Sequence, residues 1–174
     1  QQDKETCEEG GMMPGADPTR VSEVAKKRGA IQLGSLGSGN HFLEVQKVDK
    51  IYDPLAASSM GLHHEGQITI LVHCGSRGFG HQVCSDYLRV SEIASKKYGF
   101  KLADRELACV PNGSSEGNDY RSAMFSSLNF AWCNRQMITH WTRKAFERIF
   151  RTSDQALELE LVYDVSHNIA KIER

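Results

Sequence analysis

The sequence predicts an α+β fold, with strands and helices mixed along a single domain. Three stretches carry apolar residues at helical spacing, and three shorter stretches are rich in β-branched or alternating apolar residues. These stretches lack the regular βαβ spacing of a doubly wound sheet, which favours α+β. The chain has 174 residues, 40% of them hydrophobic and 25% charged, which is enough for one domain with a substantial core.

The first helix is expected to follow a loop at residues 1–16, a stretch rich in glycine and proline. Asp17 is a good N-cap residue, and Pro18 suits the first helical position. Gly29 can adopt the left-handed conformation that ends many helices. The sequence therefore predicts a helix between Asp17 and Gly29.

Three strands and two further helices are expected downstream. Residues 42–48 alternate loosely, residues 68–72 form a continuous apolar run typical of a buried strand, and residues 159–165 give a last strand. Residues 79–98 have helical spacing and stop at Gly99. Residues 118–150 are also helical, and a break is expected near Thr139 because so long a single helix is unusual.

Three histidines stand at the ends of these strand-like segments, each beside small or polar residues. They are His41, His73 and His167. A single histidine after a strand is more often structural, but three in similar settings favour a shared metal-binding cleft. Imidazole suits divalent manganese or zinc. Cys74 is not expected to share this metal, because consecutive strand side chains point to opposite faces. The remaining histidines lack this setting and are expected to be surface or packing residues: His63, His64, His81 and His140.

The turn Gly75–Gly78 has the composition of an anion site. Backbone N–H groups in a glycine-rich turn can surround phosphate oxygens, and a following helix start adds positive potential. Arg77 offers a bidentate guanidinium for phosphate. The alternative is a tight strand-to-helix turn without a ligand.

The run Asn40-His41-Phe42-Leu43-Glu44 has the chemistry of a nucleotide contact. Glu44 can accept hydrogen bonds from a purine amine, and Phe42 can stack on a base. The strand pattern alone prefers the alternative, with Phe42 in the core and Glu44 exposed.

The net charge of −1 argues against a nucleic-acid binder that works by bulk charge. Residues 134–151 nevertheless carry five basic side chains against one acidic side chain. This stretch fits a solvated helix face or, alternatively, a basic wall of an RNA groove.

The five cysteines are odd in number and have no CxxC spacing, so neither a disulfide framework nor a zinc ribbon is indicated. We expect a reducing intracellular compartment, with the cytoplasm as the location and the nucleus as an option in a eukaryote. No apolar run approaches the roughly 20 residues that span a bilayer, so no membrane association is expected.

Four segments resemble motifs of the RtcB family of RNA-splicing ligases, and they occur in the family's order. These segments are LGSLGSGNHFLEVQ, HCGSRGFGHQV, NFAWCNRQ and YDVSHNIAK. The likeness runs from about Cys7 to Arg174. It implies an RtcB-like fold and an enzyme that joins RNA ends bearing a 2′,3′-cyclic phosphate or 3′-phosphate to a 5′-hydroxyl. It also implies GTP and two manganese ions as cofactors, a histidine–GMP intermediate, and a role in tRNA splicing or RNA repair.

The resemblance also assigns roles by motif. His41, His73 and His167 match three family ligands of the manganese site. Two stretches match nucleotide contacts: residues 40–44, which are Asn40, His41, Phe42, Leu43 and Glu44, and the pair His167 and Asn168. Arg77 matches an arginine near the reacting phosphate. The implied partners are RNA, as tRNA halves or broken RNA with 3′-phosphate ends, together with GTP and an archease-like activator or other ligase-complex subunits.

The sequence also departs from the family pattern. The family's Asp-x-x-Cys metal motif has no match, because Asp3 and Cys7 are separated by three residues in different surroundings. The family's nucleophilic histidine lies in a Cys-His-Gly-Ala-Gly-like motif that residues 1–174 do not contain. We therefore expect residues 1–174 to be the central part of a single catalytic domain and to be inactive alone. The alternatives are a truncated relative that binds nucleotide or RNA without ligating, and a metal-dependent phosphodiesterase.

Overall fold

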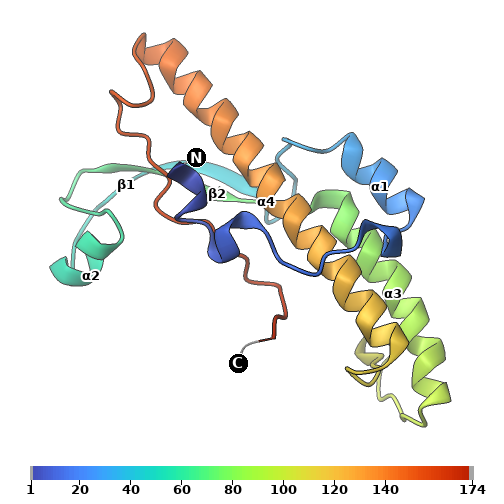
Figure 1. Cartoon of the computed structure of the whole chain (residues 1–174). Coiled ribbons are helices and arrows are strands. Elements are labelled where there is room, and N and C mark those ends of the chain that lie inside the picture. The colour runs from blue at the N-terminus through green and yellow to red at the C-terminus, as the bar shows by residue number, and fades with distance from the viewer. Residues whose placement is uncertain (1, 173–174) are drawn as a thin grey trace.

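The computed structural model describes residues 2–172 and confirms the α+β class (Figure 1). Residues 1, 173 and 174 of the predicted domain lie outside the described part. One long helix, α4 (Ser115–Phe150), runs through the molecule, and several of the other elements pack along it. Its N-cap Ser114 accepts a hydrogen bond from the Gly117 N–H.

The break predicted near Thr139 is wrong, because α4 continues for 36 residues. Leu128, Trp132 and Ile138 are buried along it, so packing supports the helix across its middle. Beyond this region the helix projects from the body of the molecule (Figure 1).

Helices α1 (Glu23–Ala30) and α3 (Arg77–Lys97) pack beside the N-terminal half of α4. The core between them contains Val21, Ala25, Phe79, Val83 and Ala123. The predicted helix 79–98 is thus confirmed, with Gly99 in the left-handed region after its end.

The helix expected between Asp17 and Gly29 is divided in two. Asp17 caps a short 3₁₀ turn, η3 (Pro18–Arg20), and α1 begins only after its own N-cap, Ser22. Gly29 does not end the helix. It is buried inside α1, where a Cβ would lie 2.7 Å from the Phe79 ring. Close helix packing, rather than a left-handed turn, requires glycine here.

The remaining short elements are 3₁₀ turns and one brief helix. The N-terminal stretch expected to be a loop contains η1 (Gln2–Lys4) and η2 (Glu8–Gly11). A six-residue helix, α2 (Pro54–Ser59), lies between the strands, and η4 (Arg105–Leu107) follows α3.

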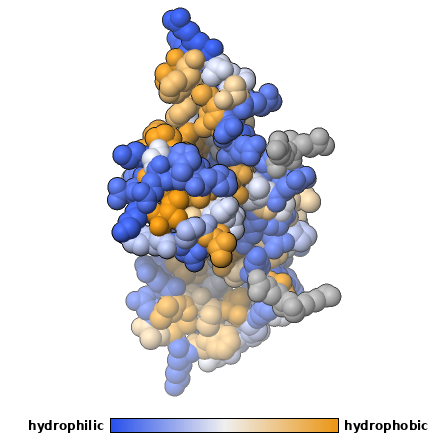
Figure 2. All heavy atoms as spheres, turned by 90° about the vertical axis from the view of Figure 1, so that its left-hand side faces the viewer, coloured by the Kyte–Doolittle hydropathy of each residue, from blue (hydrophilic) through white to orange (hydrophobic). Residues whose placement is uncertain are grey.

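Strands β1 (Phe42–Lys47) and β2 (Ile68–His73) form an antiparallel pair in which Phe42 lies opposite His73 and Lys47 lies opposite Ile68. The expectation that β2 is buried is wrong for the described residues, since Ile68 is 57% exposed and Leu71 is 42% exposed. Figure 2 shows apolar patches among hydrophilic residues on the side of the molecule that carries α2 and this pair.

The predicted strand 159–165 is also wrong. Within residues 2–172 this segment makes one isolated parallel bridge, between Asp164 and Cys7. A strand needs a partner of similar length. Here the segment runs beside the 3₁₀ turns of the N-terminus instead.

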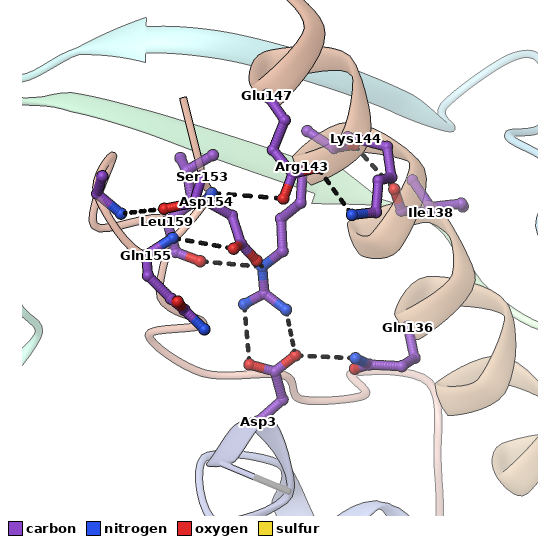
Figure 3. Close-up of polar contacts among 12 residues, drawn as sticks. Asp3, Gln136, Ile138, Arg143, Lys144, Glu147, Ser153, Asp154, Gln155 and Leu159 are labelled. Atoms are coloured by element: carbon purple, nitrogen blue, oxygen red, sulfur yellow. Dashed lines mark hydrogen bonds and ion pairs between the residues drawn. The ribbon is translucent and has the colours of Figure 1, made fainter. Parts of the chain in front are cut away.

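Polar contacts fasten the two terminal segments to α4 and to each other. Arg143 of α4 grips the Asp3 carboxylate with both terminal nitrogens and donates from Nε to the Leu159 carbonyl (Figure 3). Lys171 donates to Glu8 at 2.9 Å. The Arg143 contacts hold the C-terminal segment at Leu159, and the Lys171 contact holds it after His167.

None of the helices within residues 2–172 is both long and apolar enough to cross a membrane.

Candidate metal and phosphate site

The structure brings the three predicted histidines together. His41 directly precedes β1, His73 is the last residue of β2, and His167 lies on the C-terminal segment. The ring centroids of His41 and His73 are 6.1 Å apart, and those of His73 and His167 are 5.1 Å apart. Residues separated by more than 120 positions in the sequence therefore share one surface.

Strand pairing places Phe42 and Glu44 on the face of the sheet that carries His73. Phe42 meets the His73 ring edge-on at 5.2 Å, so it supports the imidazole as a half-buried neighbour. Glu44 is exposed and accepts a hydrogen bond from Gln46 Nε2 at 2.8 Å. The exposure of Glu44 agrees with the strand pattern and also leaves its carboxylate accessible to a ligand.

His41 carries a nitrogen that no described group satisfies. Its Nδ1 is buried and has no hydrogen-bond partner among the described residues. Burial lowers the pKa of His41, and the charges of Arg77 and His73 lower it further. A neutral imidazole with a free nitrogen is the form that binds metals.

Gly37 allows the chain to pass close to two site residues. A Cβ at Gly37 would overlap His41 Nδ1 and Arg77 Nη1. Since its φ is not in the left-handed region, close approach rather than backbone freedom requires glycine at this position.

Arg77 begins α3 with φ of 53°, a left-handed conformation that is uncommon for a residue other than glycine. Its Nε donates to Ser35 Oγ at 3.2 Å. This conformation costs free energy, and such strained residues cluster at functional sites.

The turn before α3 is only partly available to an anion. The Gly78 N–H already donates to Gln32 Oε1 at 2.7 Å. Gly75, in contrast, borders open space, because a Cβ there would meet no atom within 4 Å. The phosphate site therefore stays a prediction for the backbone of Gly75–Arg77. The Gly78 N–H is not available to a phosphate, because it already has an acceptor.

The side chains of Cys74, Asp3 and Cys7 are engaged with other groups. Cys74 is buried, and its sulfur accepts from Asn134 Nδ2 at 3.3 Å, as strand alternation predicts. Asp3 forms the ion pair with Arg143 already described, and Cys7 Sγ donates to the Asp3 carbonyl.

Comparison with known proteins identifies the family. Residues 1–174 match the family described as tRNA-splicing ligase RtcB. The chain belongs to the RtcB family. It is 60% identical over 173 residues to the tRNA-splicing ligase RtcB of Thermococcus kodakarensis and 56% identical over 173 residues to that of Archaeoglobus fulgidus. Each alignment covers 99% of this chain and 36% of the relative. The RtcB relative from Methanococcus maripaludis is 56% identical over 174 residues, which cover 36% of its length.

The imidazole donors at this candidate site suit a divalent metal, but they are not arranged as a complete coordination site. Within residues 2–172, no group of three His, Cys, Asp or Glu side chains is placed so that it could hold one ion. The adjacent imidazoles, and the His41 Nδ1 that has no hydrogen-bond partner, are donors of the type that binds divalent metals. These residues would therefore supply only part of the coordination.

The other predicted site residues are close in sequence to His41 or His167. Asn40 and Asn168 are exposed, and Leu43 is half-buried opposite Val72. The four histidines predicted to be surface or packing residues are all exposed: His63, His64, His81 and His140.

The basic stretch of this RtcB chain, residues 134–151, is mostly neutralised. Arg135 pairs with Asp164, Arg143 pairs with Asp3, and Lys144 pairs with Glu147. Arg148 and Arg151 remain exposed. This pairing argues against a basic groove wall. The solvated-face interpretation holds for Lys144, Arg148 and Arg151 but not for Arg135, which is buried.

Sequence reasoning missed two buried polar residues behind the histidines, Asn134 and Arg135. A signal was present, because Arg135 continues the helical stripe of Leu128, Ala131 and Ile138, where an apolar residue is expected. A charged side chain in an apolar helix stripe is expected to be buried only when it is paired with an opposite charge or hydrogen-bond acceptors.

Proposed function

We propose that this chain forms part of an RNA ligase that acts in tRNA splicing. One observation supports the proposal most directly. His41, His73 and His167 meet beside Arg77 in a chain of the RtcB family. The convergence is chemically specific, because three imidazoles next to a guanidinium suit phosphate chemistry with a bound metal.

The reaction we propose joins an RNA end bearing a 2′,3′-cyclic phosphate or 3′-phosphate to a 5′-hydroxyl end. It uses GTP and proceeds through a histidine–GMP intermediate. The motif expected to carry that histidine does not occur in residues 1–174. The chain spans 36% of the length of the relatives from Thermococcus kodakarensis and Archaeoglobus fulgidus, so the activity proposed is that of the whole protein.

His41, His73 and His167 would hold manganese, with two ions in the complete site and the remaining donors supplied by other groups. Bound manganese would supply positive charge beside the reacting phosphates. The chain's own contribution is to orient the imidazoles and to keep His41 neutral. The lowered pKa of His41, caused first by burial, supports this assignment.

Residues 40–44 and 167–168 would contact the guanine nucleotide. Glu44 is exposed on the same face as His73, so its carboxylate can accept from a guanine amine. Asn40 and Asn168 are exposed beside the histidines and offer amide donors and acceptors.

Arg77 would contact the RNA phosphate. Its guanidinium lies against the Gly37 backbone next to His41. Because Nε is held by Ser35, the two terminal nitrogens can face an anion while the stem stays fixed. The archease-like activator remains an inferred partner that rests on the family alone.

The test uses the full-length protein with labelled GTP and manganese, followed by RNA ends carrying a 2′,3′-cyclic phosphate and a 5′-hydroxyl. The proposal expects an acid-labile GMP adduct and a joined RNA. His73→Ala should abolish both. Hydrolysis of the cyclic phosphate without an adduct would instead establish a phosphodiesterase, and binding without either reaction would establish a nucleotide-binding relative.

A further inference from the structure

The three histidine-bearing segments are fastened to two consecutive residues of α4, Asn134 and Arg135. Among the described residues, the hydrogen bonds of both go to groups other than the imidazoles. Asn134 is fully buried, and Arg135 is 8% exposed. Both lie in the middle of the helix, away from its projecting end.

Arg135 spreads its guanidinium over two segments. Nη1 donates to the Cys74 carbonyl at 3.1 Å, and Nε donates to Asp164 Oδ1 at 2.6 Å. Nη2 also reaches Ser166 Oγ at 3.4 Å.

The positions of these partners give Arg135 its significance. Cys74 directly follows His73, and Ser166 directly precedes His167. One planar cation therefore fixes the spacing between two segments that are more than 90 residues apart in the chain. The two imidazoles that these segments carry are 5.1 Å apart.

Asn134 ties the remaining segment to the same helix. Its Oδ1 accepts from the Gly34 and Ser35 N–H groups at 2.7 and 3.2 Å. Its Nδ2 lies within hydrogen-bond distance of the Gly75 carbonyl at 3.0 Å, and of Cys74 Sγ and the Ser35 carbonyl at 3.3 Å. One amide thus uses both its donor and acceptor sides to join the loop before Gly37 to the end of β2.

This loop leads directly to the other two site residues. Ser35 Oγ accepts from Arg77 Nε, and Gly37 packs against both His41 and Arg77. The contacts of Asn134 therefore lead, through Ser35 and Gly37, to His41 and Arg77. The contacts of Arg135 lead in the same way to the neighbours of His73 and His167.

Stability alone is a poor explanation for this arrangement. A buried ion pair loses its hydration, and apolar residues of similar size often stabilise a core equally well or better. Arg135 occupies an apolar stripe position of α4, where leucine or methionine would satisfy packing. What an apolar residue cannot do is hold three oxygen atoms from two segments in one plane.

We infer that Asn134 and Arg135 are positioning residues that set the mutual placement of His41, His73 and His167 for metal binding. This inference rests on the proposed function for the identity of the metal. Their role resembles that of outer hydrogen-bond partners in metalloproteins, but they bind backbone and side-chain groups of three segments rather than the imidazoles themselves.

The test compares two conservative changes on one helix of the full-length protein. Arg135→Lys keeps the charge and removes the planar fork. The matched control is Arg143→Lys, which alters another arginine–aspartate pair of α4 that makes no contact with residues 34–41 or 73–77. Ser166→Ala is a milder third variant that removes a single acceptor of Arg135.

Two readouts separate positioning from folding. The first is manganese affinity, measured from the free-ion electron spin resonance signal. The second is the ¹H–¹³C spectrum of labelled histidines in the metal-free protein. His63 and His64, which are exposed and distant in sequence from the fork, serve as internal references. Thermal unfolding is recorded for every variant.

Arg135→Lys should weaken manganese binding by about 10–100-fold and shift or broaden the His73 and His167 signals. Arg143→Lys should leave both readouts close to wild type even where its melting temperature falls. Ser166→Ala should move the His167 signal and leave His73 in place.

Equal loss of manganese affinity in both arginine variants would overturn the inference, because it would make the effect one of general stability. Unchanged histidine signals in Arg135→Lys would also overturn it. Should Arg135→Lys fail to fold, an unmoved His167 signal in Ser166→Ala would decide against the inference. A wild-type protein that binds no manganese would reject the proposed function, while the histidine spectra would still test the positioning.

Discussion

Phe42 faces His73 across the β1–β2 pair, and its ring meets the imidazole edge-on with centroids 5.2 Å apart. Phe42→Ala should therefore release the His73 ring. We expect a loss of about 1–2 kcal/mol in the free energy of unfolding, below the value for a fully buried phenylalanine because this ring is half-buried. Urea unfolding measures this loss, and a manganese titration should show weaker binding. Phe42→Leu should recover most of the stability, and an unaffected manganese affinity in Phe42→Ala would contradict the supporting role.

Arg77 combines a strained backbone with a proposed phosphate contact. Arg77→Ala should reduce RNA joining on the order of 100-fold and GMP loading much less, because the side chain is assigned to the RNA phosphate. Arg77→Gly should lose the same activity yet be about 1 kcal/mol more stable than Arg77→Ala, since glycine adopts φ of 53° without strain. Single-turnover assays of each step provide the comparison. Equal loss of loading and joining would remove the assignment.

Two glycines at the site should respond differently to an added methyl group. Gly37→Ala places a Cβ against His41 and Arg77, so we expect a loss of about 1–3 kcal/mol in stability together with loss of GMP loading. Gly75→Ala adds its Cβ to open space and should leave stability unchanged. If a phosphate approaches the Gly75 backbone, this second variant should impair RNA joining alone. Unfolding curves and joining assays on both variants distinguish a packing role from a ligand contact.

The ion pair between Asp3 and Arg143 makes stability depend on pH in the acid range. Hydrogen bonds from Arg143 lower the pKa of Asp3 below its ordinary value of 3.8. The folded state therefore binds this proton less tightly than the unfolded chain does. The stabilisation is complete above about pH 5 and is lost as the pH falls through 3.8 towards the lowered value.

Asp3→Asn should accordingly cost about 1 kcal/mol at pH 7, because the pair is only partly shielded from solvent. The difference between the wild type and this variant should shrink as the pH falls below 3.8. Urea unfolding at a series of pH values gives the comparison. A difference that stays constant down to pH 2.5 would exclude this pair as the cause.

Residues 1–174 alone should form no enzyme–GMP adduct, since the family's nucleophile motif is absent from them. Incubation with labelled GTP and manganese, followed by a search for acid-labile label on the protein, tests this expectation. A stoichiometric adduct would mean that another residue serves as nucleophile. His81 is exposed on α3, so it would be the first residue to test by substitution as that nucleophile.

Several local elements and the choice of candidate site residues followed from the sequence because they depend on short-range chemistry. Alternation of apolar and polar residues predicted β1, and helical spacing of apolar residues predicted α3. The histidines at segment ends indicated the candidate site. The expected strand at 159–165 failed because a strand is defined by its partner, and this segment has only the single bridge to Cys7. The expected break in α4 failed because packing along the helix outweighs a statistical limit on helix length.

Only the tertiary structure decided which side chains hold the site together. Side-chain types and spacing determined that His41, His73 and His167 are candidate ligands, but their distances from one another depend on contacts between segments far apart in the chain. Those contacts run through Asn134 and Arg135, whose partners include backbone carbonyls that carry no sequence signature. A sequence specifies what each residue can bind, whereas the folded chain decides which groups lie within hydrogen-bond distance.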